Sequence, residues 1–168
     1  MKIHFAAKTL EEYLNQLSGK EPVPGGGSAA AFTAALGAGL VSMVTNYSIG
    51  RKANTKAIDK KLNTILKQSE VIRKRLLELT SLDSDAYLQL TAARSLDQKA
   101  QHQASKEARR VPLEVCNLCY KALDLTPFLV AQGNPYLLSD VQVAVELLMA
   151  GFNGAIIMVR INSWVQKY

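Results

Sequence analysis

The sequence predicts an all-α protein, a multihelical up-and-down bundle that we expect to form a dimer. Apolar residues recur at intervals of three and four along most of the chain, and no segment alternates convincingly as a strand would. Gly and Pro are concentrated at a few junctions, where they would end helices. Two helical segments are rich in small residues, which allow neighbouring helices to approach closely.

Length and composition indicate one domain over residues 1–168. A chain of this length can bury a core, and its 48% hydrophobic and 20% charged residues are typical of globular proteins. The first ten residues lack the apolar core of a signal peptide, so we expect a cytoplasmic protein. The net charge of +6 suggests an anionic partner, either nucleic acid, a membrane surface or a small acidic ligand, although a solvated helix face would also explain it.

The first helix is predicted to begin after Thr9, because Thr9 and Glu12 have the spacing of a capping box. Ser18 and Gly19 end this helix, and Ser28 is placed to cap the next one. The apolar stripe of the first helix consists of Leu10, Tyr13, Leu14 and Leu17.

Residues 22–50 contain no charged side chain and are the most informative part of the chain. They open with Gly25, Gly26, Gly27 and Ser28 and continue as a helix of Ala, Gly, Ser and Thr. A glycine loop before so slender a helix lets a ligand approach the backbone closely. The length also permits a membrane-spanning helix, but the few large apolar residues disfavour that alternative. The loop lacks the sequence of a P-loop and the preceding strand of a dinucleotide fingerprint.

A long basic helix is predicted from about Asn54 onward, and Asp83 occupies a position of its apolar stripe. A carboxylate placed where Leu or Ile is expected needs partners or a raised pKa if it is buried. If the helix instead ended near residues 80–82, Asp83 would be an exposed cap. The stripe consists of Ile58, Leu62, Ile65, Ser69, Ile72, Leu76, Leu79, Asp83, Ala86 and Leu90.

Two more helices complete the predicted bundle. One runs from about Ser105 to Leu125, with Pro112 at a kink or in a first turn. The last begins at a second capping box, residues 139–142, and its near absence of charge indicates a central helix buried on most sides. Asp140 in its first turn is explained equally well by the helix dipole or by a ligand. Asn134 lies in a Gly-Asn-Pro turn and could offer its amide to a heterocycle.

The cysteines and histidines do not suggest a metal site. Cys116 and Cys119 form a single Cys-x-x-Cys, and the chain's two histidines are His4 and His102, whereas a zinc site needs about four ligands. We therefore interpret the cysteines as small apolar residues of a helix. Scarce histidine also disfavours Ser-His-Asp and Cys-His catalysis.

Several segments, taken in order, carry a resemblance to a known family. They are Pro24–Ser28 with the helix after it, Val44–Lys52, Asp83–Tyr87, Asn134 with Ser139–Asp140, and the helix that ends near Asn162. Together they resemble the cyclodeaminase/cyclohydrolase family of folate enzymes. Residues 96–103 lack the Pro-Lys expected of that family, and the chain is short for it.

The resemblance implies an all-helical homodimer that binds a tetrahydrofolate derivative, with or without a polyglutamyl tail, in a cleft near the dimer interface. The first implied activity is that of a formiminotetrahydrofolate cyclodeaminase, which closes 5-formimino-tetrahydrofolate to the 5,10-methenyl form and releases ammonia. The alternative is a methenyltetrahydrofolate cyclohydrolase, which adds water to give the 10-formyl form. Both need proton transfer and stabilisation of a delocalised cation, for which carboxylates suffice. We expect neither a metal nor a further cofactor.

Roles for individual residues follow from the resemblance and the residue types. Asp83 is assigned to proton transfer, and Asp140 to cation stabilisation or ligand orientation. Arg51 and Lys52 would attract the glutamyl tail, and Asn134 would contact the ligand. The pocket wall would consist of Gly25, Gly26, Gly27 and Ser28.

A non-catalytic protein that binds nucleic acid is the alternative from another class. The basic face between Lys56 and Arg75 supports it, but the sequence has no recognition motif and no aromatic residues interleaved with the charges. We therefore expect neither nucleic acid nor a membrane as the partner.

Overall fold

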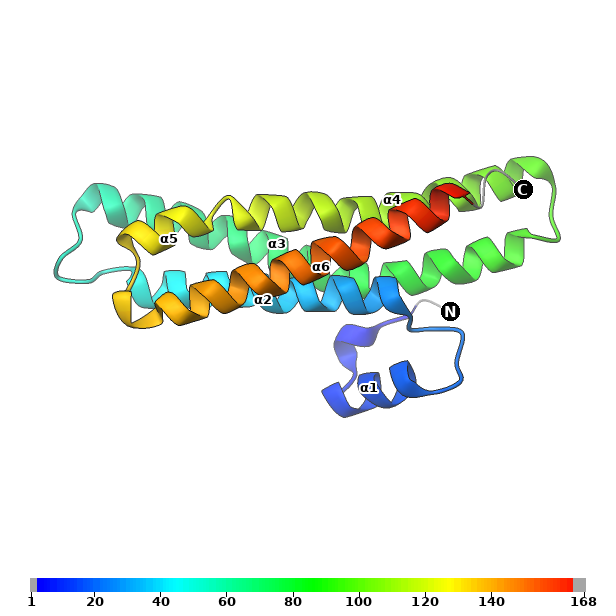
Figure 1. Cartoon of the computed structure of the whole chain (residues 1–168), viewed down its shortest axis with the longest axis horizontal. Helices are drawn as coiled ribbons and strands as arrows, with labels where there is room; N and C mark the ends of the chain where they lie inside the picture. Colours follow the sequence, from blue (N-terminus) through cyan, green and yellow to red (C-terminus); the bar gives the residue numbers. More distant parts are fainter. Residues whose placement is uncertain (1–2, 165–168) are drawn as a thin grey trace.

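The computed structural model describes residues 3–164, with side chains as far as Asn162, and this range contains helices and no strand (Figure 1). The long helices α2, α3, α4 and α6 lie side by side and alternate in direction, which confirms the predicted all-α class (Figure 1). The short helix α1 lies beside the bundle near the start of α2, and α5 lies towards the other end of α2. The elements are η1 (Phe5–Ala7), α1 (Leu10–Ser18), α2 (Gly26–Ser48), α3 (Lys56–Ala93), α4 (Gln98–Leu123), α5 (Thr126–Gln132), η2 (Pro135–Leu137) and α6 (Leu138–Trp164).

Helix α3 is continuous over 38 residues, so the alternative break near residues 80–82 does not occur. The predicted stripe faces the core: Leu62, Ile65, Leu76 and Leu79 are fully buried. Burial of each such side chain stabilises the fold by about 1.5–3 kcal/mol. The stripe therefore fixes the face of α3 on which Asp83 lies.

The seam between α2 and α6 depends on small residues, as the sequence predicts. A Cβ atom on Gly37 would lie 2.8 Å from Cγ of Leu148 and 2.9 Å from the carbonyl oxygen of Ala144. On the other helix, a Cβ atom on Gly151 would lie 2.7 Å from Cβ of Ala34. Glycine at these positions lets the two helix backbones approach closely along the seam.

Helix α1 begins as predicted but packs differently. The Thr9 hydroxyl accepts from the Glu12 amide at 3.1 Å, and the Glu12 carboxylate accepts from the Thr9 amide at 2.7 Å, which confirms the capping box. The predicted apolar stripe is only partly buried, since Tyr13 is buried whereas Leu10 and Leu14 are 67% and 57% exposed. A nine-residue helix beside the bundle is too short and too peripheral to bury a whole face.

Two predicted helix starts are also wrong. Helix α2 begins at Gly26 with Gly25 as its N-cap, and Ser28 lies inside the helix, where its hydroxyl contacts Tyr13 rather than capping. Helix α4 begins seven residues before Ser105, because the Asp97 carboxylate accepts from the Ala100 amide at 2.8 Å and caps it there.

The last helix departs from the prediction at its start and in its burial. The turn η2 leads into α6 at Leu138, so Ser139 is already helical and does not begin a capping box. Both α2 and α6 are long and apolar enough to cross a membrane by length and composition, but 61% of the α2 segment and only 28% of the α6 segment are buried in the fold. Helix α6 is therefore an outer helix of the bundle with a largely uncovered face.

The seam predicts a contrast between two glycines of α2. Gly37→Ala should lower the free energy of unfolding by about 1–3 kcal/mol, since the new methyl group meets the backbone of α6. Gly39→Ala, where the Cβ atom would lie 3.6 Å from the Arg73 side chain, should instead raise it by up to about 1 kcal/mol, because Ala favours a helix. Urea unfolding of both variants measures the difference, and equal effects would contradict the close packing of this seam.

Candidate active site

The carboxylate of Asp83 on α3 lies against the first turn of α2. A Cβ atom on Gly27 would collide with both carboxylate oxygens, so Asp83 packs directly on the backbone of the glycine loop. The Ser28 amide donates a hydrogen bond to the carboxylate. The first amides of a helix have no partner within it, and a carboxylate there satisfies one and benefits from the helix dipole. The structure thus joins Asp83 with the predicted glycine loop.

Burial changes the protonation of Asp83. Desolvation raises the pKa of this carboxyl to about 6, and the hydrogen bond from the Ser28 amide offsets only part of that effect. A carboxyl with a pKa near 6 can both accept and return a proton close to neutral pH. This is the property that the sequence predicts for an acid placed on an apolar stripe.

A cavity of about 260 Å³ opens beside Asp83. Asp83 and Asn162 bring polar groups to this cavity, and Leu90 and Met158 bring apolar ones. Such a cavity can hold a flat, partly polar group against the glycine backbone. The full lining consists of Pro22, Val23, Gly25, Gly26, Gly27, Asp83, Tyr87, Leu90, Ala108, Met158 and Asn162.

Tyr13 of α1 contacts the first turn of α2 next to the site. The sequence did not indicate this contact. Its hydroxyl lies 3.1 Å from the Ser28 hydroxyl, and burial raises the pKa of this phenol. Its ring packs against Phe5 and Phe32, with both pairs of ring centroids 5.3 Å apart. The N-terminal segment thereby fixes the turn on which Asp83 rests.

Asn162 is held at the cavity by a hydrogen bond that also compensates for Pro112 inside α4. Pro112 lies inside α4 and has no amide hydrogen for the carbonyl of Ala108, four residues earlier. The Asn162 side-chain amide donates to that carbonyl at 2.6 Å and replaces the missing hydrogen bond. This contact ties the end of α6 to α4 at the rim of the cavity.

The other predicted site residues lie at the opposite end of α2. The Arg51 guanidinium donates to the Gly133 carbonyl, and the backbone amide of Asn134 donates to the Ser48 hydroxyl at 2.9 Å. Lys52 is exposed and Asp140 is half-buried. Since α2 has 23 residues, this end lies about 33 Å from the glycine loop. One chain therefore does not bring these four residues to Asp83.

The cysteines belong to the core. Cys116 and Cys119 are buried free thiols on α4, and burial raises the pKa of Cys119 to about 12. Both stay uncharged at neutral pH, which confirms their interpretation as small apolar residues.

Comparison with known proteins identifies the family. Residues 9–165 match the family described as formiminotransferase-cyclodeaminase. The chain belongs to this family. Among its relatives, a methenyltetrahydrofolate cyclohydrolase of Methylorubrum extorquens is 35% identical, over 93% of this chain and 79% of that protein.

Other relatives are named as cyclodeaminases. The formimidoyltransferase-cyclodeaminase of Rattus norvegicus is 29% identical over 92% of this chain, which spans 30% of that longer protein. The crystal structure of a formiminotetrahydrofolate cyclodeaminase from Thermotoga maritima superposes with a TM-score of 0.89 at 26% identity, over 94% of this chain and 79% of that one. The family therefore joins two enzymes named for neighbouring folate reactions.

The raised pKa predicts how Asp83→Asn changes stability. The folded pKa of about 6 exceeds the ordinary value of 3.8, so the folded state holds the proton more tightly, and ionisation of Asp83 destabilises the fold as pH rises from about 4 to 6. The variant cannot ionise and should be more stable than the natural chain at pH 7.5, by on the order of 1–3 kcal/mol, with no gain below pH 4. Chemical unfolding at both pH values tests this, and a gain that is independent of pH would contradict it.

Proposed function

We propose that this chain is a folate-dependent enzyme that acts on the one-carbon bridge between N5 and N10 of tetrahydrofolate. The observation that carries the proposal is the carboxyl of Asp83, with a pKa near 6, held on a glycine turn beside a small cavity. Membership of the family supports the substrate class. In this proposal the pterin end of the folate, with N5 and N10, occupies the cavity.

Hydrolysis of the 5,10-methenyl bridge is the first reaction we assign. Water adds to the bridging carbon and gives a proton to the Asp83 carboxylate, which produces a tetrahedral carbon bonded to both nitrogens. Asp83 then returns this proton to N5 and the bond between N5 and the carbon breaks. The carbinol hydroxyl loses its proton to solvent as the C=O bond forms, and the resulting formyl group stays on N10. The negative charge of Asp83 also stabilises the cationic amidinium of the substrate.

Cyclodeamination is the second candidate, and it uses the same groups. N10 attacks the carbon of the protonated formimino group (N5–CH=NH2+), which leaves an amino group on the tetrahedral carbon, and N10 gives its proton to Asp83. Asp83 passes a proton to the amino nitrogen of the tetrahedral intermediate, which leaves as ammonia and gives the methenyl bridge. The 35% identity with a cyclohydrolase supports the first reaction, and the TM-score of 0.89 with a cyclodeaminase supports the second.

The catalytic test is the turnover of both substrates by the Asp83→Asn variant. Turnover is measured through the absorbance of methenyl-tetrahydrofolate. Loss of the proton-transferring group should lower turnover about 10²–10⁴-fold while the protein stays folded. Asp85→Asn is the matched control, since it makes the same charge change two residues along α3, where the carboxylate accepts from the Ile3 amide instead. Equal turnover of the natural chain and Asp83→Asn would remove Asp83 from the chemistry.

We further propose that the protein is a homodimer that pairs through α2 and α6. Both helices leave apolar side chains exposed, among them Leu36 on α2 and Val143 and Ile157 on α6, the last two 50% and 53% exposed. Water contact with so long an apolar face is unfavourable, and a second copy would cover it. The scarcity of charge on both helices suits an interface core.

Antiparallel pairing would also complete the active site. Asp83 lies near the start of α2 and the end of α6, whereas Asp140 lies at the start of α6. A two-fold axis across the middle of this face would bring Asp140 of the partner subunit towards Asp83, along with the partner's Asn134, Arg51 and Lys52. In this arrangement the cations lie where a glutamyl tail would leave the cavity.

Subunit mixing tests the shared site. Asp83→Asn and Asp140→Asn chains, each inactive alone, should recover about a quarter of natural activity when unfolded and refolded together, because half of the dimers are mixed and each mixed dimer has one intact site. Mixtures that stay inactive would contradict a site shared between subunits, and a monomer in sedimentation would contradict the dimer itself.

A further inference from the structure

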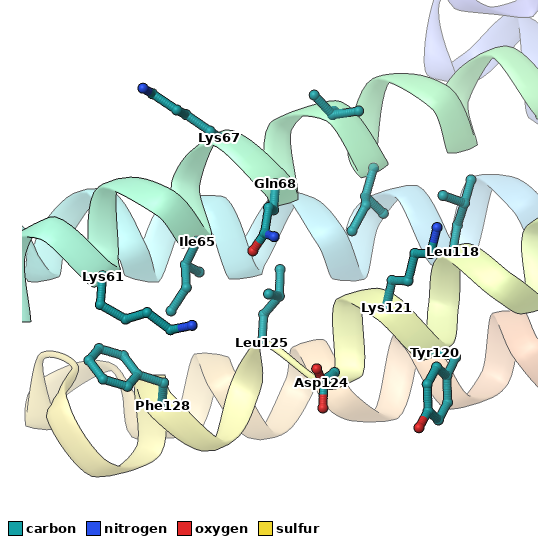
Figure 2. Close-up of a pocket in the computed structure, with 12 residues that line it drawn as sticks. Lys61, Ile65, Lys67, Gln68, Leu118, Tyr120, Lys121, Asp124, Leu125 and Phe128 are labelled. Atoms are coloured by element: carbon teal, nitrogen blue, oxygen red, sulfur yellow. The ribbon is translucent and has the colours of Figure 1, made fainter.

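A second concave site lies between α3, the last turns of α4 and the start of α5 (Figure 2). This groove has a volume of about 700 Å³ and an apolar floor. Ile65 and Leu125 of this floor are buried, and Phe128 is half-buried. The whole lining consists of Lys61, Ile65, Lys67, Gln68, Val71, Ile72, Leu118, Tyr120, Lys121, Asp124, Leu125 and Phe128.

Two lysines reach into the groove from opposite sides. Figure 2 shows the side chain of Lys61 extending from α3 over Phe128, and that of Lys121 extending from α4 towards α3, with Gln68 between them. Lys67 points away from the groove in the same view. The groove therefore combines an apolar floor with two ammonium groups and an amide directed inward.

The groove keeps a net positive charge among the described residues, because three lysines and one aspartate line it. The arginines Arg73, Arg75 and Arg110 all pair with glutamates, at distances of 2.6–2.8 Å. None of these ion pairs involves Lys61 or Lys121, and Asp124 is the one carboxylate among the lining residues. Charge complementarity thus favours an anion in this groove.

The groove is separate from the active site. Gln68 and Asp83 are fifteen residues apart on one continuous helix, which corresponds to about 22 Å. The two sites also share no lining residue.

We propose that this groove binds a small amphiphilic carboxylate, with an acyl or aryl body on the apolar floor and its carboxylate between Lys61 and Lys121. The volume lies within the range of about 300–1,000 Å³ that is common for small-molecule sites. Leu118, Leu125 and Phe128 supply the apolar contact, and the Gln68 amide can donate to the second carboxylate oxygen. The site goes beyond the folate chemistry proposed above and does not depend on it.

The probe is laurate, titrated calorimetrically below its micelle concentration. We expect saturable binding, weaker for octanoate because each buried CH₂ group contributes up to about fourfold in affinity. Dodecanol, which has the same chain without the charge, should bind about tenfold more weakly. Lys61→Gln with Lys121→Gln should weaken laurate binding by a similar factor.

The matched control is the double variant Lys60→Gln with Lys106→Gln, which removes the same charge from exposed positions on the same two helices. It should bind laurate within about twofold of the natural chain, since charges outside the groove act only through a screened field. Circular dichroism checks that both double variants are folded. Absence of saturable binding, equal loss in the two double variants, or equal affinity for dodecanol and laurate would each overturn the proposal.

Discussion

The contact between the Asp83 carboxylate and the backbone of Gly27 is the constraint on which the candidate active site depends. It requires a residue without a side chain at position 27, a free helix amide at Ser28 and an unbroken α3 that carries the carboxyl to that point. Burial at this contact raises the pKa of Asp83 to about 6 and makes the charged form unfavourable. The chain thus retains a destabilising group where proton transfer would need it, as active sites commonly do.

The rest of the bundle holds this contact in place. The small residues of α2 and α6 bring the end of α6 to the cavity. The Tyr13 hydroxyl lies within hydrogen-bond distance of the Ser28 hydroxyl. Asn162 links α6 to α4 through the carbonyl that Pro112 leaves without a partner. Pro112 and Asn162, fifty residues apart, thereby connect α4 and α6. The face of α6 that stays exposed could be covered by a second subunit.

Much of the fold could be predicted because helical periodicity is a local signal. The stripe of α3 located Asp83 on a buried face, and the glycine loop indicated where a ligand could approach the backbone. Contacts between distant segments leave no such signal. No periodic spacing in the sequence indicates that Tyr13 contacts Ser28 or that Asn162 contacts Ala108. The burial of α6 was predicted wrongly because an apolar helix inside a core and an apolar helix with an exposed face have similar composition. Asp140 lies at the start of α6 and Asp83 near its end. This separation depends on how the helices are arranged, which the residues next to Asp83 or Asp140 in the sequence do not indicate.

The most direct test of the central claim is the titration of the Asp83 carboxyl itself, followed by carbon NMR on protein labelled at aspartate and assigned with the Asp83→Asn variant. The account predicts a midpoint near pH 6, well above that of an exposed aspartate, which moves when a folate occupies the neighbouring cavity. A midpoint near 4 that is unaffected by folate would show that Asp83 is an ordinary surface carboxylate, and would contradict the proposed active site.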